Sequence, residues 1–342
     1  MSYTVPQTPL PLPSRLSGLG LLFLLTLLPS FAPAQSPATP PDPVTVQLDW
    51  LPSAQFAGIL LAQSRGYYRA QHLNVTILPS DSDMEPFARI AAASNIIGVS
   101  EADSLLVERA RYPQIRAFAT MMQSTPFCLI TLKQSGLTTI PSLRGKRIGL
   151  HGDGHRTIDE LLHYNGMALS DVTLVDIPLS LDPLISGQVD AIQGYTNDEV
   201  VRLTLAHHPV NVIPMASNGY VSYAEVLFTS AAMLQQKPDV LLRFLRATRQ
   251  GWQAAARNPR QTAQWLVRTY LPKSSVNEQL EALNQVIPLL NAETHDSRYG
   301  QMSPQTWEKS LAMFHKYQAA DATFSAADLV DYSILNQLDA KK

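Results

Sequence analysis

The sequence predicts an α/β protein whose chain forms two lobes with a ligand cleft between them. Short runs of β-branched residues alternate with amphipathic helical stretches, which is the pattern of β-α-β units on a mostly parallel sheet. This alternation begins at Val44, begins again near Phe127, and is followed by a helical C-terminal part. With 342 residues, of which 45% are hydrophobic and 16% charged, the chain can bury more than one core. Two lobes joined by two crossings are expected to trap a ligand by hinge closure.

The N-terminal segment, residues 1–34, is predicted to be a signal peptide. Arg15 is the only charged residue before Asp42, and it precedes an apolar run from Leu19 to Leu28. The small residues Ala32-Pro33-Ala34 then form a cleavage site, so we expect cleavage after Ala34 and export to the periplasm. The alternative is a membrane anchor, which needs about 20 apolar residues, roughly twice the length of this run.

Composition excludes several function classes. A formal charge of −2 provides no excess of lysine and arginine, so we expect no nucleic-acid partner. Removal of residues 1–34 takes away Arg15 and no acidic residue, which changes the charge from −2 to −3. The only cysteine, Cys128, excludes an intramolecular disulfide, and its apolar neighbours indicate a buried side chain. The eight histidines form no ligand set, so we expect neither a metal nor a cofactor.

The first lobe is predicted from residues 44–125, preceded by a proline-rich linker over 35–43, and the chain returns to this lobe over 224–342. Its strands are expected at 44–48, 73–78, 96–99, 115–121 and 225–229. Helices are expected between them at 54–64, 85–93 and 103–111. Apolar residues at helical spacing predict C-terminal helices over 240–256, 259–270, 277–290, 304–317 and 326–338.

The second lobe is predicted from residues 126–223, with crossings near 124–127 and 220–225. Its strands are expected at 127–132, 147–150, 172–177, 189–193 and 210–215. Its helices are expected at 155–164, 182–186 and 198–206.

Four sequence blocks, spanning roughly residues 44–270, together resemble one family of exported proteins. The first block reads Leu-Asp-Trp-Leu-Pro-x-x-Gln-Phe-Ala-Gly over residues 48–58 and continues through Arg65-Gly66-Tyr67-Tyr68 into residues 73–77. The other three are Leu-Arg-Gly-Lys-Arg-Ile-Gly at 143–149, Gly-Gln-Val-Asp-Ala-Ile-Gln-Gly-Tyr at 187–195 and the helical stretch 244–259. Their order is similar to that of the solute-binding proteins that carry thiamine-pyrimidine precursors to ABC transporters.

This resemblance implies the type II periplasmic-binding fold and a role in transport. The ligand would be a small planar heterocycle, catalysis would be absent, and the partner of the monomeric protein would be a transporter permease with its ATPase. Related domains serve as extracellular sensors, so a periplasmic protein that acts on a separate membrane signalling protein is the alternative. The fold also serves as an iron-dependent pyrimidine-precursor synthase, but this chain has Phe56 where the synthase has histidine and lacks its cysteine-rich segment.

Two groups of candidate ligand-binding residues follow predicted strands, where open α/β sheets bind ligands. Asp49 and Trp50 follow the first strand. Trp50 would stack on a planar ring and Asp49 would accept hydrogen bonds, whereas the alternative is a core tryptophan beside a capping aspartate. Gly152-Asp153-Gly154-His155 follows the strand at 147–150 and opens a helix, whose N-terminus would receive a carbonyl or anionic group of the ligand.

Tyr195, Asn197 and Glu199 follow the strand predicted at 189–193. Glu199 is the expected polar anchor, because a carboxylate forms charge-assisted hydrogen bonds with an aminopyrimidine edge. A first-turn helix glutamate is its alternative role. Glu101 and Tyr223 complete the candidate set, and helix capping or hinge packing explains either of them equally well. Formylaminopyrimidine, hydroxymethylpyrimidine, a flavin, a sulfonate and other aromatic solutes all remain open as ligands.

Overall fold

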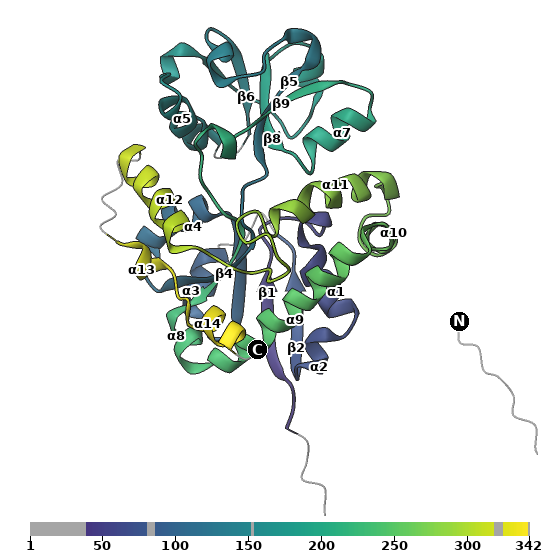
Figure 1. Ribbon diagram of the computed structural model, residues 1–342, viewed down its shortest axis with the longest axis vertical. Helices are drawn as coiled ribbons and strands as arrows, with labels where there is room; N and C mark the ends of the chain where they lie inside the picture. The colour runs from purple at the N-terminus through teal and green to yellow at the C-terminus, as the bar shows by residue number, and fades with distance from the viewer. Residues whose placement is uncertain (1–38, 81–85, 152–153, 318–323, 341–342) are drawn as a thin grey trace, which may run out of the picture. The chain divides into compact units, whose positions relative to one another are not determined.

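The computed structural model describes residues 39–80, 86–151, 154–317 and 324–340 (Figure 1). The predicted signal peptide and most of the predicted linker lie outside these ranges. The described residues from Pro40 onward belong to one compact unit, in which the strands form two five-stranded sheets. Within the described ranges, no helix combines the length and the apolar character needed to cross a membrane.

Lobe I is the lobe built on the sheet with strand order β2-β1-β3-β10-β4. Strand β1 runs parallel to β2 and β3, whereas β10 runs antiparallel to both of its neighbours, β3 and β4. Alternate side chains of β1 are buried, and β10 is buried along its whole length. The strands are β1 (Asp42–Gln47), β2 (Leu73–Leu78), β3 (Ile96–Ser100), β4 (Ile115–Met122) and β10 (Ala224–Ser230).

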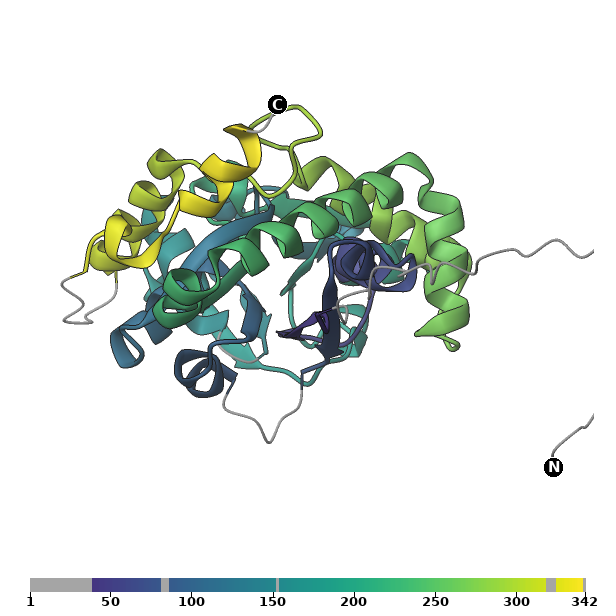
Figure 2. The same cartoon turned by 90° about the horizontal axis from the view of Figure 1, so that it is seen from below.

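The helices of lobe I come from both of its sequence segments, the one before lobe II and the one after it. The long helix α9 (Pro238–Arg257) begins with proline at its first turn and buries an apolar stripe against α1, α2 and α14. Figure 2 shows α9, in green, running between the yellow C-terminal helices and the paler green α10 and α11. The other helices are α1 (Ala57–Ser64), α2 (Tyr67–Ala70), α3 (Pro86–Ala92), α4 (Ala102–Arg111), α8 (Ala231–Gln236), α10 (Pro259–Thr269), α11 (Val276–Leu289), α12 (Pro304–Tyr317), α13 (Ala326–Leu329) and α14 (Ser333–Ala340).

Lobe II is the lobe built on the sheet with strand order β7-β6-β8-β5-β9. Strand β6 is parallel to β7 and β8, and β5 is antiparallel to β8 and β9. Two separate clusters of buried apolar side chains form its core. Its strands are β5 (Phe127–Leu132), β6 (Arg147–Leu150), β7 (Thr173–Asp176), β8 (Ala191–Tyr195) and β9 (Val210–Pro214), and its helices are α5 (Gly154–Tyr164), α6 (Asp182–Ile185) and α7 (Glu199–Leu205).

The two sheets repeat one topology. In each sheet the antiparallel strand is the first one that the chain forms after it crosses from the other sheet: β5 follows β4 through residues 123–126, and β10 follows β9 through residues 215–223. Every other strand in each sheet shares one direction. The predicted fold class is confirmed, because two α/β lobes with mixed sheets, in which four of five strands share one direction, are joined by two crossover segments.

The C-terminal helix predicted over 326–338 is wrong, since the structure has two short helices there. Helix α13 ends at Leu329, and Val330 forms a parallel bridge with Ala117 of β4. The backbone N–H of Asp331 also donates to the carbonyl oxygen of Ala117 at 2.8 Å. Because β4 is an edge strand with open backbone groups, this pairing competes successfully with continuation of the helix.

Two strands begin two residues away from their predicted starts. Strand β1 begins at Asp42, so Pro43 lies in the sheet rather than in the linker. The nitrogen of Pro43 faces the β3 side, where pairing with β1 starts only at Thr45, so no ladder hydrogen bond is lost. Strand β8 begins at Ala191 rather than at 189, because Gly187, with φ 74°, turns the chain, and the N–H of Val189 donates to the carbonyl of Pro183.

Candidate functional site

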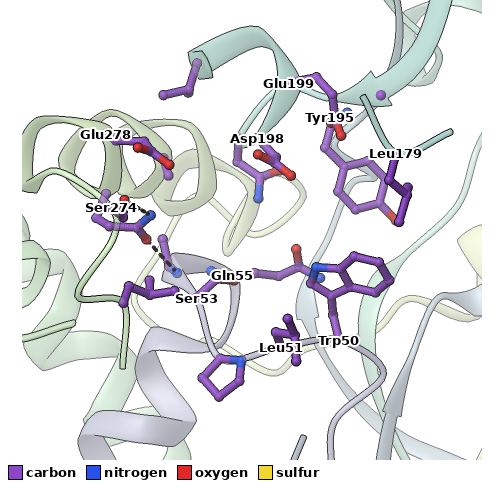
Figure 3. A pocket seen from close by; sticks show the side chains of 18 of the residues that line it. Trp50, Leu51, Ser53, Gln55, Leu179, Tyr195, Asp198, Glu199, Ser274 and Glu278 are labelled. Carbon is purple, nitrogen blue, oxygen red and sulfur yellow. Dashed lines mark hydrogen bonds between the residues drawn. The ribbon is translucent and has the colours of Figure 1, made fainter. Parts of the chain in front are cut away.

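A cavity of about 710 Å³ lies between the two lobes. Lobe I contributes residues 49–55, which join β1 to α1, together with the start of α11. Lobe II contributes the end of β8, the turn that follows it and residues 177–179. Figure 3 shows side chains from both lobes projecting into this space. The cavity is therefore placed where the predicted cleft was expected.

Five of the residues predicted from the sequence line this cavity: Asp49, Trp50, Tyr195, Asn197 and Glu199. They meet there because Asp49 follows the carboxyl end of β1 and Tyr195 ends β8. In Figure 3, Trp50 and Tyr195 extend into the cavity from opposite lobes. Both side chains are aromatic and line the cavity.

The Trp50 indole is 48% exposed, so this residue is not the core tryptophan of the alternative interpretation. Its neighbour Asp49 lies deeper, and desolvation raises the pKa of its carboxyl to about 7. The Oδ1 atom of Asp49 is buried and accepts no hydrogen bond from any described residue.

Tyr195 connects the cavity to lobe I. Its hydroxyl donates to Oε1 of Glu101 at 3.1 Å, and its ring meets Phe127 edge to face at 4.6 Å between centroids. Glu101 precedes α4 and does not line the cavity. The predicted candidate Glu101 therefore lies behind Tyr195 as its interlobe hydrogen-bond partner.

Glu199 is the first residue of α7. It lines the cavity and also forms a hydrogen bond within lobe II. Its Oε2 accepts the backbone N–H of Tyr195 at 2.8 Å, which fixes the turn after β8. Desolvation, followed by the neighbouring Asp198 carboxylate, raises the pKa of Glu199 to about 7. Nearby, Asn197 and Gln193 are each 6% exposed, and the Oδ1 and Oε1 atoms of these residues accept no hydrogen bond within the described part of the chain.

A third carboxyl group, that of Glu225, lies near Asp49 and Glu101. Glu225 is 1% exposed, has a left-handed φ of 53°, and accepts a hydrogen bond from Nε2 of Gln55. Burial, then the charges of Asp49 and Glu101, hold its pKa well above the usual range of a glutamate. The sequence offers no sign of this residue, which sits in a predicted strand.

The remaining predicted residues that the structure describes do not line the cavity. His155 faces Asp176, with 2.7 Å between Nε2 and Oδ1, and both side chains are exposed. Gly154 begins α5, where a Cβ atom would lie 1.7 Å from Oε1 of Gln193, so a larger residue would require the Gln193 side chain to shift. Gly152 and Asp153 lie outside the described residues.

Tyr223 is fully buried beside the second crossing. Its hydroxyl donates to Glu293 at 2.8 Å and accepts the N–H of Ser303 at 2.7 Å. Its ring also meets Trp307 at 5.7 Å between centroids. Hinge packing, the alternative considered for Tyr223, matches these contacts.

Helix α11 contributes cavity residues that sequence reasoning missed. Gln279 accepts the N–H of Ala54 through Oε1 at 3.2 Å and donates through Nε2 to Ser274 at 3.0 Å, which ties the lobe I loop to the helix. Glu278 lines the cavity one residue earlier. In the sequence, Ser275 and Glu278 indicate only a helix start, because nothing local shows which side of α11 faces the cleft.

The lining suits non-covalent binding of a polar aromatic molecule. It combines aromatic rings with buried acceptor oxygens and carboxylates. Among the residues that the structure describes, no group of three or more histidine, cysteine, aspartate or glutamate side chains is arranged to hold a metal ion. Cys128 is fully buried and donates to the carbonyl of Gly194 at 3.3 Å.

We expect the free energy of unfolding of the wild type to contain a component that falls between about pH 4 and pH 7. A carboxyl with a raised pKa keeps its proton when folded and loses it when unfolded, so rising pH favours unfolding until the folded group also ionises. Asp49 and Glu199, with pKa values of about 7, define this window. Urea denaturation at several pH values should show a smaller fall in Asp49→Asn than in wild type, and an unchanged fall in Glu308→Gln, which alters an exposed residue of α12. Equal profiles for Asp49→Asn and wild type would contradict this assignment.

Comparison with known proteins identifies the family. The family model described as NMT1/THI5 like matches residues 53–262, which is more than half of the chain. The chain belongs to the NMT1/THI5-like family. This confirms the resemblance expected from the four sequence blocks.

The names of similar proteins refer to different activities. A Haemophilus influenzae protein whose name refers to thiamine biosynthesis is 28% identical over 304 residues, 84% of this chain and 91% of that protein. The riboflavin-binding protein RibY of Chloroflexus aurantiacus is 24% identical over 319 residues, 86% of this chain and 90% of RibY. The 4-amino-5-hydroxymethyl-2-methylpyrimidine phosphate synthase of Uromyces fabae is 28% identical over 233 residues, 64% of this chain and 68% of the synthase.

A solved structure supports the fold. The alkanesulfonate-binding protein SsuA of Xanthomonas axonopodis pv. citri superposes with a TM-score of 0.66 at 15% identity, covering 86% of this chain and all of SsuA. The family member described here therefore has the type II periplasmic-binding fold that the resemblance implied.

Proposed function

We propose that this protein is the exported solute-binding component of an ABC importer and that it captures a small planar heterocycle of the thiamine-pyrimidine-precursor type. The observation that carries this proposal is the interlobe cavity, in which Trp50 of lobe I and Tyr195 of lobe II extend from opposite sides. The names of the thiamine-biosynthesis and riboflavin-binding relatives support a heterocyclic cargo. In this proposal, the signal peptide is cleaved after Ala34 and the protein acts as a monomer in the periplasm.

Closure of the lobes is the proposed mechanism. Residues 44–125 and 224–342 would move as one lobe, and residues 126–223 as the other. Contacts already cross the cleft: the Tyr195 hydroxyl donates to Glu101, and the Tyr220 hydroxyl donates to Oδ2 of Asp103 at 2.9 Å. A ligand that touches both lobes would add to these contacts and favour the closed form, which the transporter permease would recognise.

The test is calorimetric titration with the pyrimidine that native mass spectrometry finds bound to freshly purified protein. Trp50→Ala and Glu199→Ala should each lose at least about tenfold in affinity, about 1.4 kcal/mol, because one removes a stacking surface and the other a polar contact. Trp265→Ala is the matched control, since Trp265 lies on α10 outside the cavity. Wild-type affinity in both cavity variants would place the ligand elsewhere.

The synthase relatives make pyrimidine synthesis the second candidate function. The position at which the synthase has histidine is Phe56 in this chain, and that side chain is fully buried in the lobe I core. We therefore rank binding above synthesis. Incubation of the protein with iron and pyridoxal phosphate should yield no pyrimidine product, and a stoichiometric yield would reverse this ranking.

A further inference from the structure

Three residues that line the cavity each have a buried acceptor oxygen. Oδ1 of Asp49, Oε1 of Gln193 and Oδ1 of Asn197 belong to residues that line the cavity, and none of them accepts a hydrogen bond from the described residues. Gln193 and Asn197 are each more than nine-tenths buried. An unsatisfied buried acceptor costs about 1–3 kcal/mol, so a shift of these side chains toward N–H or O–H donors on a bound molecule would recover that cost.

Among the described residues that line the cavity, acidic side chains outnumber basic ones. Asp49, Asp198, Glu199 and Glu278 line the cavity, whereas no lysine or arginine does so among the residues described. A histidine, His151, also lines the cavity. A negative lining of this kind disfavours anions and raises the local concentration of cations.

Two of these carboxylates approach each other across the cleft. Asp198 precedes α7 in lobe II and Glu278 lies on α11 in lobe I, and the helices α7 and α11 are in contact. Figure 3 shows both side chains on the same side of the cavity. Desolvation raises the pKa of Asp198, and Glu278 adds to this rise while Arg202, 3.7 Å from Asp198, opposes it. Lobe closure therefore brings like charges together unless a positive group lies between them.

The aromatic side chains complete the site. Trp50 and Tyr195 extend into the cavity, and Phe127 packs edge to face against Tyr195 at 4.6 Å between centroids. Aromatic faces attract both planar rings and organic cations, most strongly in the case of tryptophan. A ligand that is aromatic and positively charged would use both the rings and the carboxylates.

We infer that the cargo is a small aromatic cation whose positive charge sits on N–H donors of the ammonium or amidinium type, and that the cavity rejects anionic forms of the same ring. This inference rests on the proposed function and specifies the substrate class of the same site. Shifts of the Asp49, Gln193 and Asn197 side chains toward the cation let their unsatisfied oxygens accept its N–H groups. Its charge also offsets the repulsion between Asp198 and Glu278, so cargo binding and lobe closure favour each other.

The first experiment uses three probes that share one ring. These are 4-amino-5-aminomethyl-2-methylpyrimidine, which is a cation at pH 7.5, its neutral 5-hydroxymethyl counterpart, and the anionic phosphate ester of the latter. Calorimetric titration should give an affinity for the cation at least about tenfold above that for the neutral probe and at least about a hundredfold above that for the phosphate. A neutral or anionic probe that binds more tightly than the cation overturns the inference and leaves the proposed function intact.

The second experiment covers rings other than pyrimidine. In a thermal-shift assay benzamidinium should raise the melting temperature, whereas benzamide should raise it less and benzenesulfonate should not raise it. If no pyrimidine binds but benzamidinium does, the proposed pyrimidine cargo fails and the charge inference stands. Stabilisation by benzenesulfonate in preference to benzamidinium, or by neither benzamidinium nor the aminomethyl pyrimidine, overturns the charge inference.

Variants test whether the carboxylates cause the preference. The double variant Asp198→Asn, Glu278→Gln should reduce the ratio of cation to neutral affinity about tenfold or more, because it removes both charges and retains hydrogen-bonding amides. Glu308→Gln, on the exposed face of α12, is the control and should leave the ratio unchanged. An unchanged ratio in a double variant whose thermal unfolding matches that of wild type would contradict the role of this pair.

Discussion

Replacement of Tyr195 with alanine is expected to weaken binding of the tightest-binding pyrimidine at least about a hundredfold, about 2.7 kcal/mol. The substitution removes the lobe II ring that extends into the cavity, its edge contact with Phe127 and its hydrogen bond to Glu101. The loss should exceed that of any other single truncation in the site, because Tyr195 takes part in both the cavity lining and an interlobe contact. Calorimetry at fixed pH and ionic strength measures it.

Two further variants separate the parts of this effect. Tyr195→Phe keeps the ring and removes the hydroxyl that bonds Glu101, so it should lose no more than about tenfold. Tyr164→Ala alters a tyrosine of the same lobe that is 60% exposed and lies outside the cavity lining, and should retain wild-type affinity. If Tyr195→Phe binds as weakly as Tyr195→Ala, the interlobe hydrogen bond rather than the ring determines affinity.

Replacement of Gly251 with valine should lower the free energy of unfolding by at least about 3 kcal/mol. A Cβ atom on Gly251 would lie 2.0 Å from the carbonyl oxygen of Gly58, so α9 would have to move away from α1. The facing position is equally tight, since a Cβ atom on Gly58 would lie 2.2 Å from Cγ of Trp252, which is fully buried. Backbone atoms cannot rotate aside as a flexible side chain can.

Gln250→Val provides the matched control, because it introduces the same β-branched residue at an exposed position of the same helix. Its cost should be limited to helix propensity, below about 1 kcal/mol. Urea denaturation followed by circular dichroism compares the two variants. Similar losses in Gly251→Val and Gln250→Val would show that the contact between α1 and α9 is not tight in solution.

The fold and part of the site followed from local sequence patterns. Asp49, Trp50, Tyr195, Asn197 and Glu199 were placed at a cleft because they come just after predicted strands, and the structure places all five at the cavity. Strand position alone is enough for this prediction, because open α/β sheets bind ligands beside the carboxyl ends of their strands.

Other features of the site depend on contacts between distant parts of the chain. Glu225 lies on β10, which reaches the carboxyl groups of Asp49 and Glu101 only because it inserts between β3 and β4. Glu278 reaches the cleft through the packing of α11 against the loop before α1. Tyr223 is the opposite case. It was a candidate because it lies at a predicted hinge, but its hydroxyl donates to Glu293 and accepts the N–H of Ser303 instead of facing the cavity.

The shared topology of the two sheets also determines the order in which the protein can fold. All strands of lobe II come from one continuous stretch of the sequence. In lobe I, Val226 of β10 pairs with Ser100 of β3, and the whole lobe II stretch lies between these two residues in the sequence. Such non-local pairing is slow. Lobe II can therefore complete its sheet while the lobe I sheet still lacks β10. Strand β4 has β10 as its sheet neighbour, so a chain that ends before Ala224 would leave β4 separated from β1, β2 and β3. The lobe that begins first along the chain is thus the last to be completed.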